Sequence, residues 1–359
     1  MVVVAGAGMG GLATAARLRE LGAEVTVLEK GDRPGGSMLL SSGVVWRHRS
    51  LEEFRAECPG GDPALQAAVL ERLDECLDRL ESFGAPVVHR ETGNPRTVGR
   101  RFDPKGLTDA LVRHVGKIAL EEPIVELGDE TTVLATGGFG GALARRLGLP
   151  VRGNPWSDGD GLRLALGRHA ALSRGMDEFY GRALPAPPAR IEPEDFVRLS
   201  QVYGRHALVM DEAGSVVARG DVDWHEADLV QRIARRPGGR AWYVLDDEAL
   251  RQPLSDGTVA DHVEAARAAG GTVVDARDLP FEVPGSARVA VHVVASVTHT
   301  IGGLAVDVCA RVLDDDGAPL ANLYAVGVDA GGIAAGGYAS GLAAALVLGF
   351  AAAESIRGA

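Results

Sequence analysis

Four glycines near the amino terminus have the spacing of a phosphate-binding turn. Gly6, Gly8 and Gly11 fit the pattern GxGxxG. In that pattern the first glycine permits a tight turn, the second lets the backbone approach a pyrophosphate, and the third lets a helix pack closely on a strand. Gly10 lies in the same turn. A diphosphate would lie at the amino terminus of the next helix, where free N–H groups and the helix dipole favour negative charge.

The elements around this turn are those of a βαβ unit. Val2 to Ala5 is a β-branched run typical of a strand, Leu12 to Leu21 has apolar residues at helical spacing, and Glu24 to Glu29 alternates as a second strand. Glu29 lies at the expected distance to bind ribose hydroxyls. A fortuitous glycine-rich turn is the alternative, but it does not account for the strand, the helix and the acidic residue together. We therefore expect a dinucleotide-binding unit, which by itself fits NAD as well as FAD.

A second loop of small residues follows the unit. Lys30 leads into Pro34–Ser37, which contains Gly35, Gly36 and Ser37, and then into Ser41–Gly43, which contains Ser42 and Gly43. Such a loop lets the backbone pass close to a long cofactor beyond its pyrophosphate. This favours FAD.

Further blocks follow in a fixed order along the chain. They are VLATGGFGG at 133–141, SDGDG at 157–161, HTIGG at 299–303, LYAVG at 323–327 and GGYASGLAAALVLG at 336–349. In this order the blocks resemble the fumarate reductase and succinate dehydrogenase flavoprotein family, which includes ketosteroid dehydrogenases. Residues 180 to 290 match that family only in general character.

The resemblance implies an α/β fold, in which a Rossmann-like FAD-binding domain is interrupted by a smaller α+β capping domain. We expect the FAD-binding domain at 1–178 and 289–359 and the capping domain at 179–288. Residues 176 to 285 have a different texture, with clustered prolines and no nucleotide motif. Substrate would lie between the domains, against the isoalloxazine ring.

The same resemblance implies further FAD contacts. In the middle of the chain these are Ala135, Thr136, Gly137 and Asp160. Near the carboxyl terminus, amides around Ser340, Gly341 and Leu342 would face the N1–C2 edge of the flavin, where a helix amino terminus favours negative charge. The complete predicted set is Gly6, Gly8, Gly10, Gly11, Glu29, Lys30, Gly35, Gly36, Ser37, Ser42, Gly43, Ala135, Thr136, Gly137, Asp160, Gly327, Asp329, Ser340, Gly341 and Leu342.

The implied chemistry is hydride transfer between flavin N5 and a substrate carbon, paired with proton transfer at the neighbouring carbon. His299 matches the family histidine that lies at the substrate. Its alternative is a packed histidine that props the FAD. Tyr338 and Tyr203 are the other catalytic candidates, because ketosteroid dehydrogenases use tyrosines to polarise a carbonyl and abstract a proton. The alternative for each is a buried tyrosine with a satisfied hydroxyl.

Two positions depart from the dicarboxylate-reducing members of the family. Gly336 stands where the substrate-clamping arginine is expected, and Ala227 stands before Asp228 where the proton-donating arginine is expected. A small dicarboxylate substrate is therefore not predicted. Arg182, Arg205 or His225 remain alternatives for proton delivery, each against the alternative of a solvated surface charge.

Other departures concern the cofactor. Val328 occupies the place of a family glutamate, so we expect Asp329 to contact the ribityl chain instead. The segment 116–130 is short for the family's β-meander, which indicates a shortened member. PGGSMLL contains no histidine, where membrane-complex relatives attach flavin covalently, so the FAD is expected to be non-covalent.

Composition narrows the possible partners. The 359 residues have a formal net charge of -12, without the basic excess that binds nucleic acid or anionic lipid. The three cysteines have no metal-ligand spacing, so no metal and a reducing, cytoplasmic setting are expected. The longest apolar stretch, 341–353, is too short to span a bilayer. The first residues lack the basic region of a signal peptide.

The leading hypothesis is an FAD-dependent enzyme that introduces or reduces a C–C double bond next to a carbonyl in a small, mostly neutral molecule. The electron donor or acceptor stays open. A flavin oxidase or monooxygenase acting on C–N or C–H bonds is the second hypothesis, although the SDGDG and HTIGG blocks weigh against it. A catalytically idle flavin-binding protein is the third.

Overall fold

The computed structural model describes residues 1–358, which divide into two compact units. The first unit consists of Met1–Ala142, Gly153–Phe179 and the chain from His299 onward. The second consists of Leu143–Arg152 and Tyr180–Thr298. A mixed α/β architecture interrupted by a smaller unit was predicted, and this fold class is confirmed.

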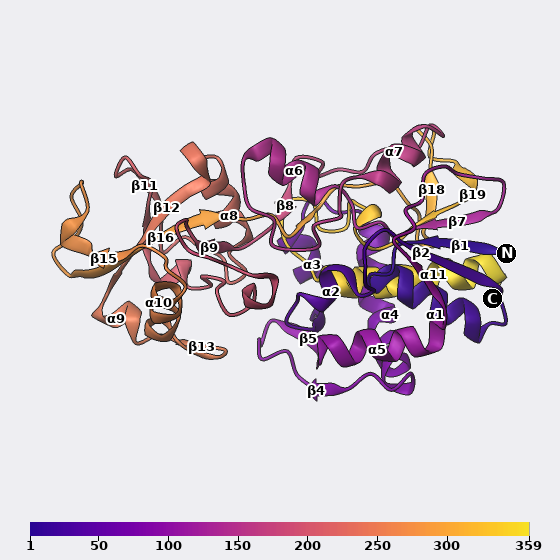
Figure 1. The fold of residues 1–359 in the computed structure, drawn as a ribbon, viewed down its shortest axis with the longest axis horizontal. Helices are drawn as coiled ribbons and strands as arrows, with labels where there is room; N and C mark the ends of the chain where they lie inside the picture. Colours follow the sequence, from indigo (N-terminus) through magenta and orange to yellow (C-terminus); the bar gives the residue numbers. More distant parts are fainter. Residues whose placement is uncertain (359) are drawn as a thin grey trace. The chain divides into compact units, whose positions relative to one another are not determined.

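The first unit is built on a six-stranded sheet (Figure 1). Val2 of the central strand lies opposite Val25 on one side and Thr131 on the other, and both pairings are parallel. In order across the sheet, the strands are β18 (Arg311–Leu313), β19 (Pro319–Ala325), β7 (Thr131–Leu134), β1 (Val2–Ala5), β2 (Val25–Glu29) and β6 (Ile118–Leu120).

Helices surround this sheet. Figure 1 shows α1, α4, α5 and α11 gathered below it in that view, and α7 above it. A small antiparallel sheet, β3 (Val44–His48), β5 (Thr97–Phe102) and β4 (Val87–His89), completes the unit. The helices are α1 (Met9–Glu20), α2 (Gly36–Leu39), α3 (Leu51–Glu57), α4 (Pro63–Ser82), α5 (Pro104–Val115), α7 (Asp160–Leu166) and α11 (Gly341–Arg357), with the 3-10 turn η5 (Gly327–Asp329). One further helix, α6 (Gly140–Leu147), begins in the first unit, and β17 (His299–Thr300) opens its last segment.

The core of the first unit is the contact between α1 and α11. Leu346, Leu348 and Phe350 of α11 are buried, and each contributes about 2 kcal/mol by leaving water. A Cβ on Gly349 would lie 3.0 Å from the carbonyl oxygen of Gly10, so glycine at this position of α11 lets the two helices approach closely. Because α11 is mostly apolar and buried, it holds the glycine turn at the start of α1 in place.

The second unit has its own antiparallel sheet, with strands in the order β11 (Val216–Arg219), β10 (Leu208–Met210), β12 (Arg240–Asp246), β16 (Ala287–Ala295) and β15 (Val273–Asp275). β9 (Ala183–Pro185) also pairs with β16. Its helices are α8 (Ala227–Ala234), α9 (Asp247–Leu250) and α10 (Val259–Ala268). The remaining elements are β8 (Phe179–Tyr180, at the border of the units), the hairpin β13 (Pro253–Leu254) and β14 (Gly257–Thr258), and the 3-10 turns η1 (Pro193–Asp195), η2 (Gly204–His206), η3 (Pro237–Gly239) and η4 (Ala276–Asp278).

The second unit ends later than the predicted capping domain. The expected boundary at 288 falls inside β16, which pairs along its length with β12 and also pairs with β15 and β9. These long-range pairings keep the chain in the second unit until Thr298. The strand is mostly apolar, as the strands of both units are, so local sequence does not assign it.

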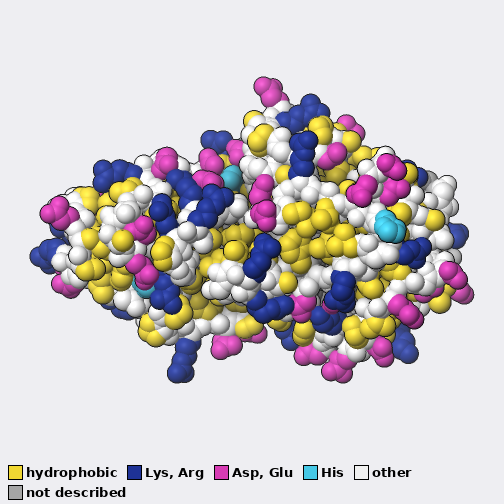
Figure 2. Space-filling model, turned by 90° about the horizontal axis from the view of Figure 1, so that it is seen from above, with side chains coloured by type: hydrophobic (Ala, Val, Ile, Leu, Met, Phe, Trp, Pro, Cys, Tyr) yellow, Lys and Arg dark blue, Asp and Glu magenta, His cyan; other side chains and the backbone are white. Residues whose placement is uncertain are grey.

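Two surface properties bear on partners. Within residues 1–358 no helix has both the length and the apolar character needed to cross a bilayer. Acidic and basic side chains are interspersed over the face seen in Figure 2. Among the same residues, no group of His, Cys, Asp or Glu side chains is arranged to hold a metal ion.

Candidate functional site

The glycine turn joins β1 to α1 and leaves no room for larger residues at three positions. Gly6 has a φ of +112°, and a Cβ on it would lie 2.0 Å from the carbonyl oxygen of Ala135. A Cβ on Gly11 would lie 1.9 Å from the carbonyl oxygen of Gly6. Gly10 is also constrained, since its Cβ would lie 2.9 Å from the amide nitrogen of Gly327. The turn therefore requires glycine for its own geometry.

Gly8 differs from the other glycines of the turn. It is the N-cap of α1, and a Cβ added to it would meet no atom within 4 Å. The backbone at Gly8 is thus open on the side where the first amides of α1 point outward. That arrangement fits the diphosphate of a dinucleotide, which needs close backbone approach at a helix amino terminus.

Glu29 lies at the end of β2, and only 5 % of its surface is exposed. Its Oε2 accepts a hydrogen bond from the amide of Ala7 at 2.7 Å, and its Oε1 accepts one from the amide of Gly31 at 2.7 Å. The carboxylate is therefore fixed beside the glycine turn. Each oxygen has a second lone pair for a ribose hydroxyl, which is the role predicted for it.

Lys30 and Asp160 are brought together by an ion pair. The ammonium of Lys30 lies 2.9 Å from Asp160 and 3.2 Å from Asp158. Burial disfavours the charge on Lys30, but the hydrogen bonds to Asp160 and Asp158 outweigh it and raise the pKa of Lys30. The pair connects the first βαβ unit to the start of α7, and any FAD contact of either residue stays a prediction.

The second small-residue loop lies against the glycine turn. The amide of Gly35 donates to the carbonyl of Ala7 at 2.7 Å. A Cβ on Gly36 would lie 3.2 Å from the Cα of Gly8. Ser37 Oγ accepts a hydrogen bond from the amide of Asn154 at 2.9 Å. The loop and the turn therefore line one continuous stretch of backbone, as a long cofactor requires.

Ser42 and Gly43 lie further along and serve the small sheet. Gly43 has a φ of +71°, and a Cβ there would lie 2.1 Å from the carbonyl oxygen of Phe102. The carbonyl of Ser42 accepts from the guanidinium of Arg101 at 3.1 Å. These contacts explain the residue types without a cofactor, and their predicted FAD contacts are untested.

Asp329 is the hub of the middle part of the site. It is fully buried, and its carboxylate accepts hydrogen bonds from the amide and the hydroxyl of Thr136 and from the amide of Gly138. The Thr136 hydroxyl in turn accepts from the amide of Gly161 at 3.1 Å. Burial raises the pKa of Asp329, although these hydrogen bonds oppose the shift.

These bonds join three of the predicted blocks. The Ala135–Gly137 turn, the start of α7 and η5 all meet at the Asp329 carboxylate. The geometry gives Asp329 a positioning role, whereas its predicted contact with the ribityl chain is untested.

The carboxyl-terminal block forms the start of α11. Ser340 is the N-cap, and its Oγ accepts from the amide of Ala343 at 3.3 Å. Gly341 and Leu342 are the first residues of the helix. A helix of this length presents outward-facing amides and a partial positive charge at this end, which suits the electron-rich edge of a flavin.

An open hollow lies beside this helix end. His299 Nδ1 lies 3.0 Å from the carbonyl oxygen of Thr300, and a Cβ on Gly341 would lie 3.1 Å from His299 Nε2. The histidine and the α11 amino terminus therefore face the same space. None of the lining residues is Lys, Arg, Asp or Glu; they are His299, Thr300, Ile301, Gly327, Val328, Ala330, Ile333, Ala334, Ala339, Ser340, Gly341 and Ala344.

The two tyrosine candidates lie in different settings. Tyr338 is half-buried on the loop that also supplies Ala339 and Ser340 to the hollow, and its ring packs against Trp46 with centroids 5.5 Å apart. Tyr203 is 0 % exposed in the second unit, where its hydroxyl donates to Gln201 Oε1 at 2.6 Å. Burial raises the pKa of Tyr203. The geometry of Tyr203 is that of a core tyrosine, so we do not retain it as a catalytic candidate.

Sequence reasoning missed a buried carboxylate in the second unit. Glu226 is 2 % exposed, and burial raises its pKa to about 7 despite the opposing effects of Arg182 and of the Arg205 amide. Arg182 Nη1 donates to the carbonyl of His225 at 2.6 Å. The alternative of a solvated surface charge is therefore wrong for His225, which is buried, and fits Arg205, which is exposed.

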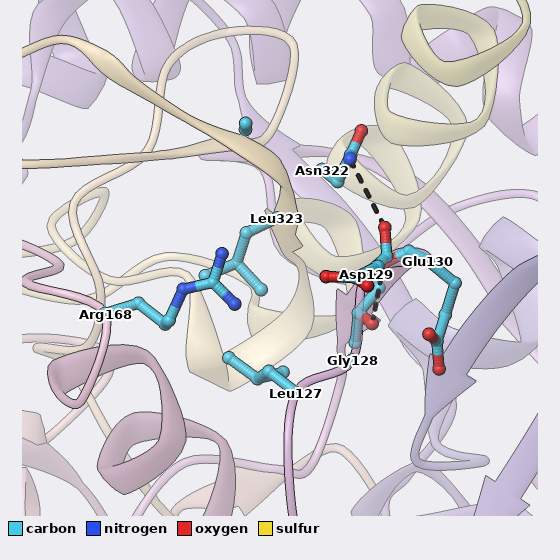
Figure 3. A pocket seen from close by; sticks show the side chains of 9 residues that line it. Leu127, Gly128, Asp129, Glu130, Arg168, Asn322 and Leu323 are labelled. Atoms are coloured by element: carbon cyan, nitrogen blue, oxygen red, sulfur yellow. Dashed lines mark hydrogen bonds between the residues drawn. The ribbon is translucent and has the colours of Figure 1, made fainter.

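A second hollow has a different lining (Figure 3). Asp129 and Glu130, just before β7, line it together with Asn322 of β19, whose side chain donates to the carbonyl of Asp129. It therefore borders the residue at which β7 begins, whereas the glycine turn follows the carboxyl end of β1. Ligands of parallel α/β sheets bind at the carboxyl ends, so this hollow is not the candidate site.

Comparison with known proteins identifies the family. The chain matches the FAD binding domain family over residues 118–342 and an NAD(P)-binding Rossmann-like domain over residues 4–48. The chain therefore belongs to the FAD binding domain family, and it is an FAD-dependent oxidoreductase. The predicted resemblance is confirmed, and the open turn at Gly8 and the fixed carboxylate of Glu29 fit that cofactor.

Similar proteins share the fold along nearly the whole chain. A probable fumarate reductase, Ifc3, of Shewanella frigidimarina is 22% identical over 92% of this chain and 70% of the relative. The open conformation of a flavocytochrome c3 fumarate reductase aligns with a TM-score of 0.73 at 21% identity, covering 100% of this chain and 78% of that one. The 3-ketosteroid-Δ4-(5α)-dehydrogenase of Rhodococcus jostii RHA1 aligns with a TM-score of 0.70 at 18% identity, covering 99% and 96%.

Proposed function

We propose that this oxidoreductase dehydrogenates or reduces a C–C bond next to a carbonyl in a small, mostly neutral molecule. The observation that carries the proposal is the hollow beside α11, because a histidine and a helix amino terminus face a space whose lining has no Lys, Arg, Asp or Glu. No Lys or Arg side chain of the lining is placed to pair with a carboxylate substrate. The related fumarate reductases and ketosteroid dehydrogenases both act on compounds with a carbonyl function, which supports the reaction class.

When bound, FAD supplies hydride transfer between its N5 and a substrate carbon. The chain supplies the surroundings of that step. The outward-facing amides at Ser340 and Gly341 favour negative charge at the helix end, and most of the lining side chains are apolar.

His299 is the proposed proton-transfer residue. Its Nδ1 is within hydrogen-bonding distance of the Thr300 carbonyl oxygen, so the neutral ring carries its proton on Nδ1. Nε2 then faces the hollow as the atom that accepts a proton or, in the protonated ring, donates one. Tyr338 is the second proposed catalytic residue, as a carbonyl polariser, since its loop forms one side of the hollow.

The test is anaerobic reoxidation of the reduced, FAD-loaded protein. Mixed with 2-cyclohexenone, a neutral α,β-unsaturated carbonyl, the flavin's visible absorbance should return as the double bond is reduced. His299→Ala should slow this step by about a hundredfold. His114→Ala is the matched control, because that ring nitrogen also contacts a backbone carbonyl, at 3.1 Å, on α5. Reoxidation by no unsaturated carbonyl of a broad panel would contradict the proposal and favour an idle flavin-binding protein.

A further inference from the structure

Glu178 lies beside two of the segments that line the hollow. Its Oε2 accepts a hydrogen bond from the amide of Gly336 at 2.7 Å, and its backbone carbonyl accepts from the amide of Ile301 at 3.0 Å. Ile301 lines the hollow, and Gly336 lies between two lining residues, Ala334 and Ala339. The Glu178 carboxylate is therefore held at the rim of the hollow, where it is hydrogen-bonded to the loop that carries Tyr338.

The charge at this rim is not neutralised within residues 1–358. Glu178 takes part in no ion pair there, and its Oε1 accepts no hydrogen bond, so one oxygen is left to receive a donor. The other carboxylate near the loop, Glu57, lies 3.8 Å from Arg96. The pKa of the Cys58 thiol is raised to about 12, mainly by burial and next by the charge of Glu57. The charge of Glu178 adds a smaller increase, and Cys58 is hydrogen-bonded to the backbone of Tyr338 on the loop. The loop therefore lies beside a negative charge, that of Glu178, which no ion pair compensates within residues 1–358.

We propose that Glu178 is a specificity-determining residue, which favours substrates carrying a positively charged hydrogen-bond donor such as an ammonium group and disfavours carboxylates. This rests on the proposed function, since it takes the hollow as the substrate site. The Gly336 amide fixes one oxygen, and the other is available to the distal end of a substrate whose conjugated carbonyl lies deeper. A charge at a half-exposed rim changes the affinity for each charged ligand by about threefold, so the cation-to-anion preference is about tenfold.

Three matched probes test the charge preference. Each contains a C=C bond conjugated to a primary amide, and they differ only at the far end: 4-(dimethylamino)but-2-enamide is cationic, pent-2-enamide is neutral and fumaramate is anionic. Their dissociation constants are measured by calorimetry on the FAD-loaded, oxidised protein. We expect the order cation, neutral, anion, with about tenfold between the first and the last.

The variant Glu178→Gln keeps an acceptor for the Gly336 amide and removes the charge. It should bring the cation-to-anion ratio close to one, while Asp109→Asn, which removes a charge from an exposed ion pair on α5, should leave the ratio unchanged. A second measurement needs no variant: raising the ionic strength should shrink the preference of the unmodified protein. An unchanged ratio in Glu178→Gln, or a preference that does not respond to salt, would overturn the assignment.

The two proposals fail separately. If the probes bind with the expected preference but none reoxidises the reduced flavin, the reaction class is wrong and the role of Glu178 stands. If 2-cyclohexenone and all three probes reoxidise it while binding shows no charge preference, the reaction class stands and the role of Glu178 is wrong.

Discussion

The two units solvate their buried carboxylates in different ways. In the first unit, Glu29 and Asp329 accept hydrogen bonds mainly from backbone amides of turns that follow strands. In the second unit, Glu226 is nearly as buried, but its backbone donors are only the amide of Arg205, at a long 3.3 Å, and the amide of Gly204 among the described residues. Its main compensation is the charge of Arg182.

This difference separates a fixed scaffold from a titrating group. Amide donors belong to the turn itself, so the first-unit carboxylates hold the backbone around the candidate site in one geometry. Burial outweighs the donors of both Asp329 and Glu226 and raises the pKa of each, and the pKa of Glu226 reaches about 7, so its proton is exchanged near neutral pH. The second unit leaves another buried polar group poorly solvated. The buried hydroxyl of Tyr243 has no hydrogen-bond partner within residues 1–358.

The largest expected effect comes from adding a methyl group to the scaffold. Gly11→Ala should prevent folding or abolish FAD binding, because its Cβ would lie 1.9 Å from a backbone oxygen that cannot move without breaking the turn. Gly8→Ala should leave the melting temperature of the FAD-free protein nearly unchanged, because a Cβ there meets nothing, but should weaken FAD binding by about a hundredfold through the lost backbone approach. Thermal unfolding and fluorescence titration with FAD measure the two effects. Equal losses of stability in both variants would contradict the distinction.

Removing the hub carboxylate should cost nearly as much. Asp329→Ala leaves the buried amides of Thr136 and Gly138 and the Thr136 hydroxyl without their acceptor, at about 1–3 kcal/mol each before relaxation. We expect a loss of about 4 kcal/mol in the free energy of unfolding, measured with urea. Asp329→Asn, which keeps one acceptor oxygen, should lose about half as much. A loss below 1 kcal/mol for alanine would mean that the three blocks are not held together at this residue.

The second unit should respond to pH near neutrality through Glu226. The pKa of Glu226 is raised from 4.5 to about 7, so its protonated form is favoured by folding. Stability is then fully present below pH 4.5 and falls by about 3 kcal/mol as the pH rises through 7. Glu226→Gln should flatten this part of the profile, measured as unfolding free energy against pH. A variant whose profile keeps the same fall would assign the titration to another group.

The smallest expected effect is at the ion pair of Lys30. Its side chain is 34% exposed, and an exposed pair is worth less than about 1 kcal/mol, so Lys30→Ala should lower stability only slightly. Raising the salt concentration should reduce even that difference. A loss of several kcal/mol in thermal unfolding would show that the pair has the scaffold role assigned to Glu29 and Asp329.

Local patterns predicted the first unit well. The strand at 2–5, the strand predicted at 24–29 and observed at 25–29, and the glycine turn all depend on residues near one another in sequence. The start of α1 at Met9 instead of Leu12 is a small difference, because the apolar periodicity begins later than the helix that Gly8 caps. The order of the blocks added the family and the cofactor, whereas the site around His299 stays a prediction.

Long-range contacts could not be predicted in the same way. Asp329 was predicted to contact the cofactor. Nothing in the local sequence shows that its carboxylate accepts hydrogen bonds from the amides of a turn almost two hundred residues earlier. Tyr203 and Glu226 lie among polar neighbours in sequence and become buried only when the sheet of the second unit forms. Glu178 was missed for a related reason, since its partner Gly336 comes from the far end of the chain.

The central claim is that His299, Tyr338 and the amino terminus of α11 surround the reacting atoms. A crystal structure of the FAD-loaded protein with pent-2-enamide tests it most directly. The account predicts a His299 or Tyr338 side-chain atom within about 3.5 Å of the amide carbonyl or of flavin N5, and the ring edge against Ser340 and Gly341. Both side chains pointing away from that space would contradict it.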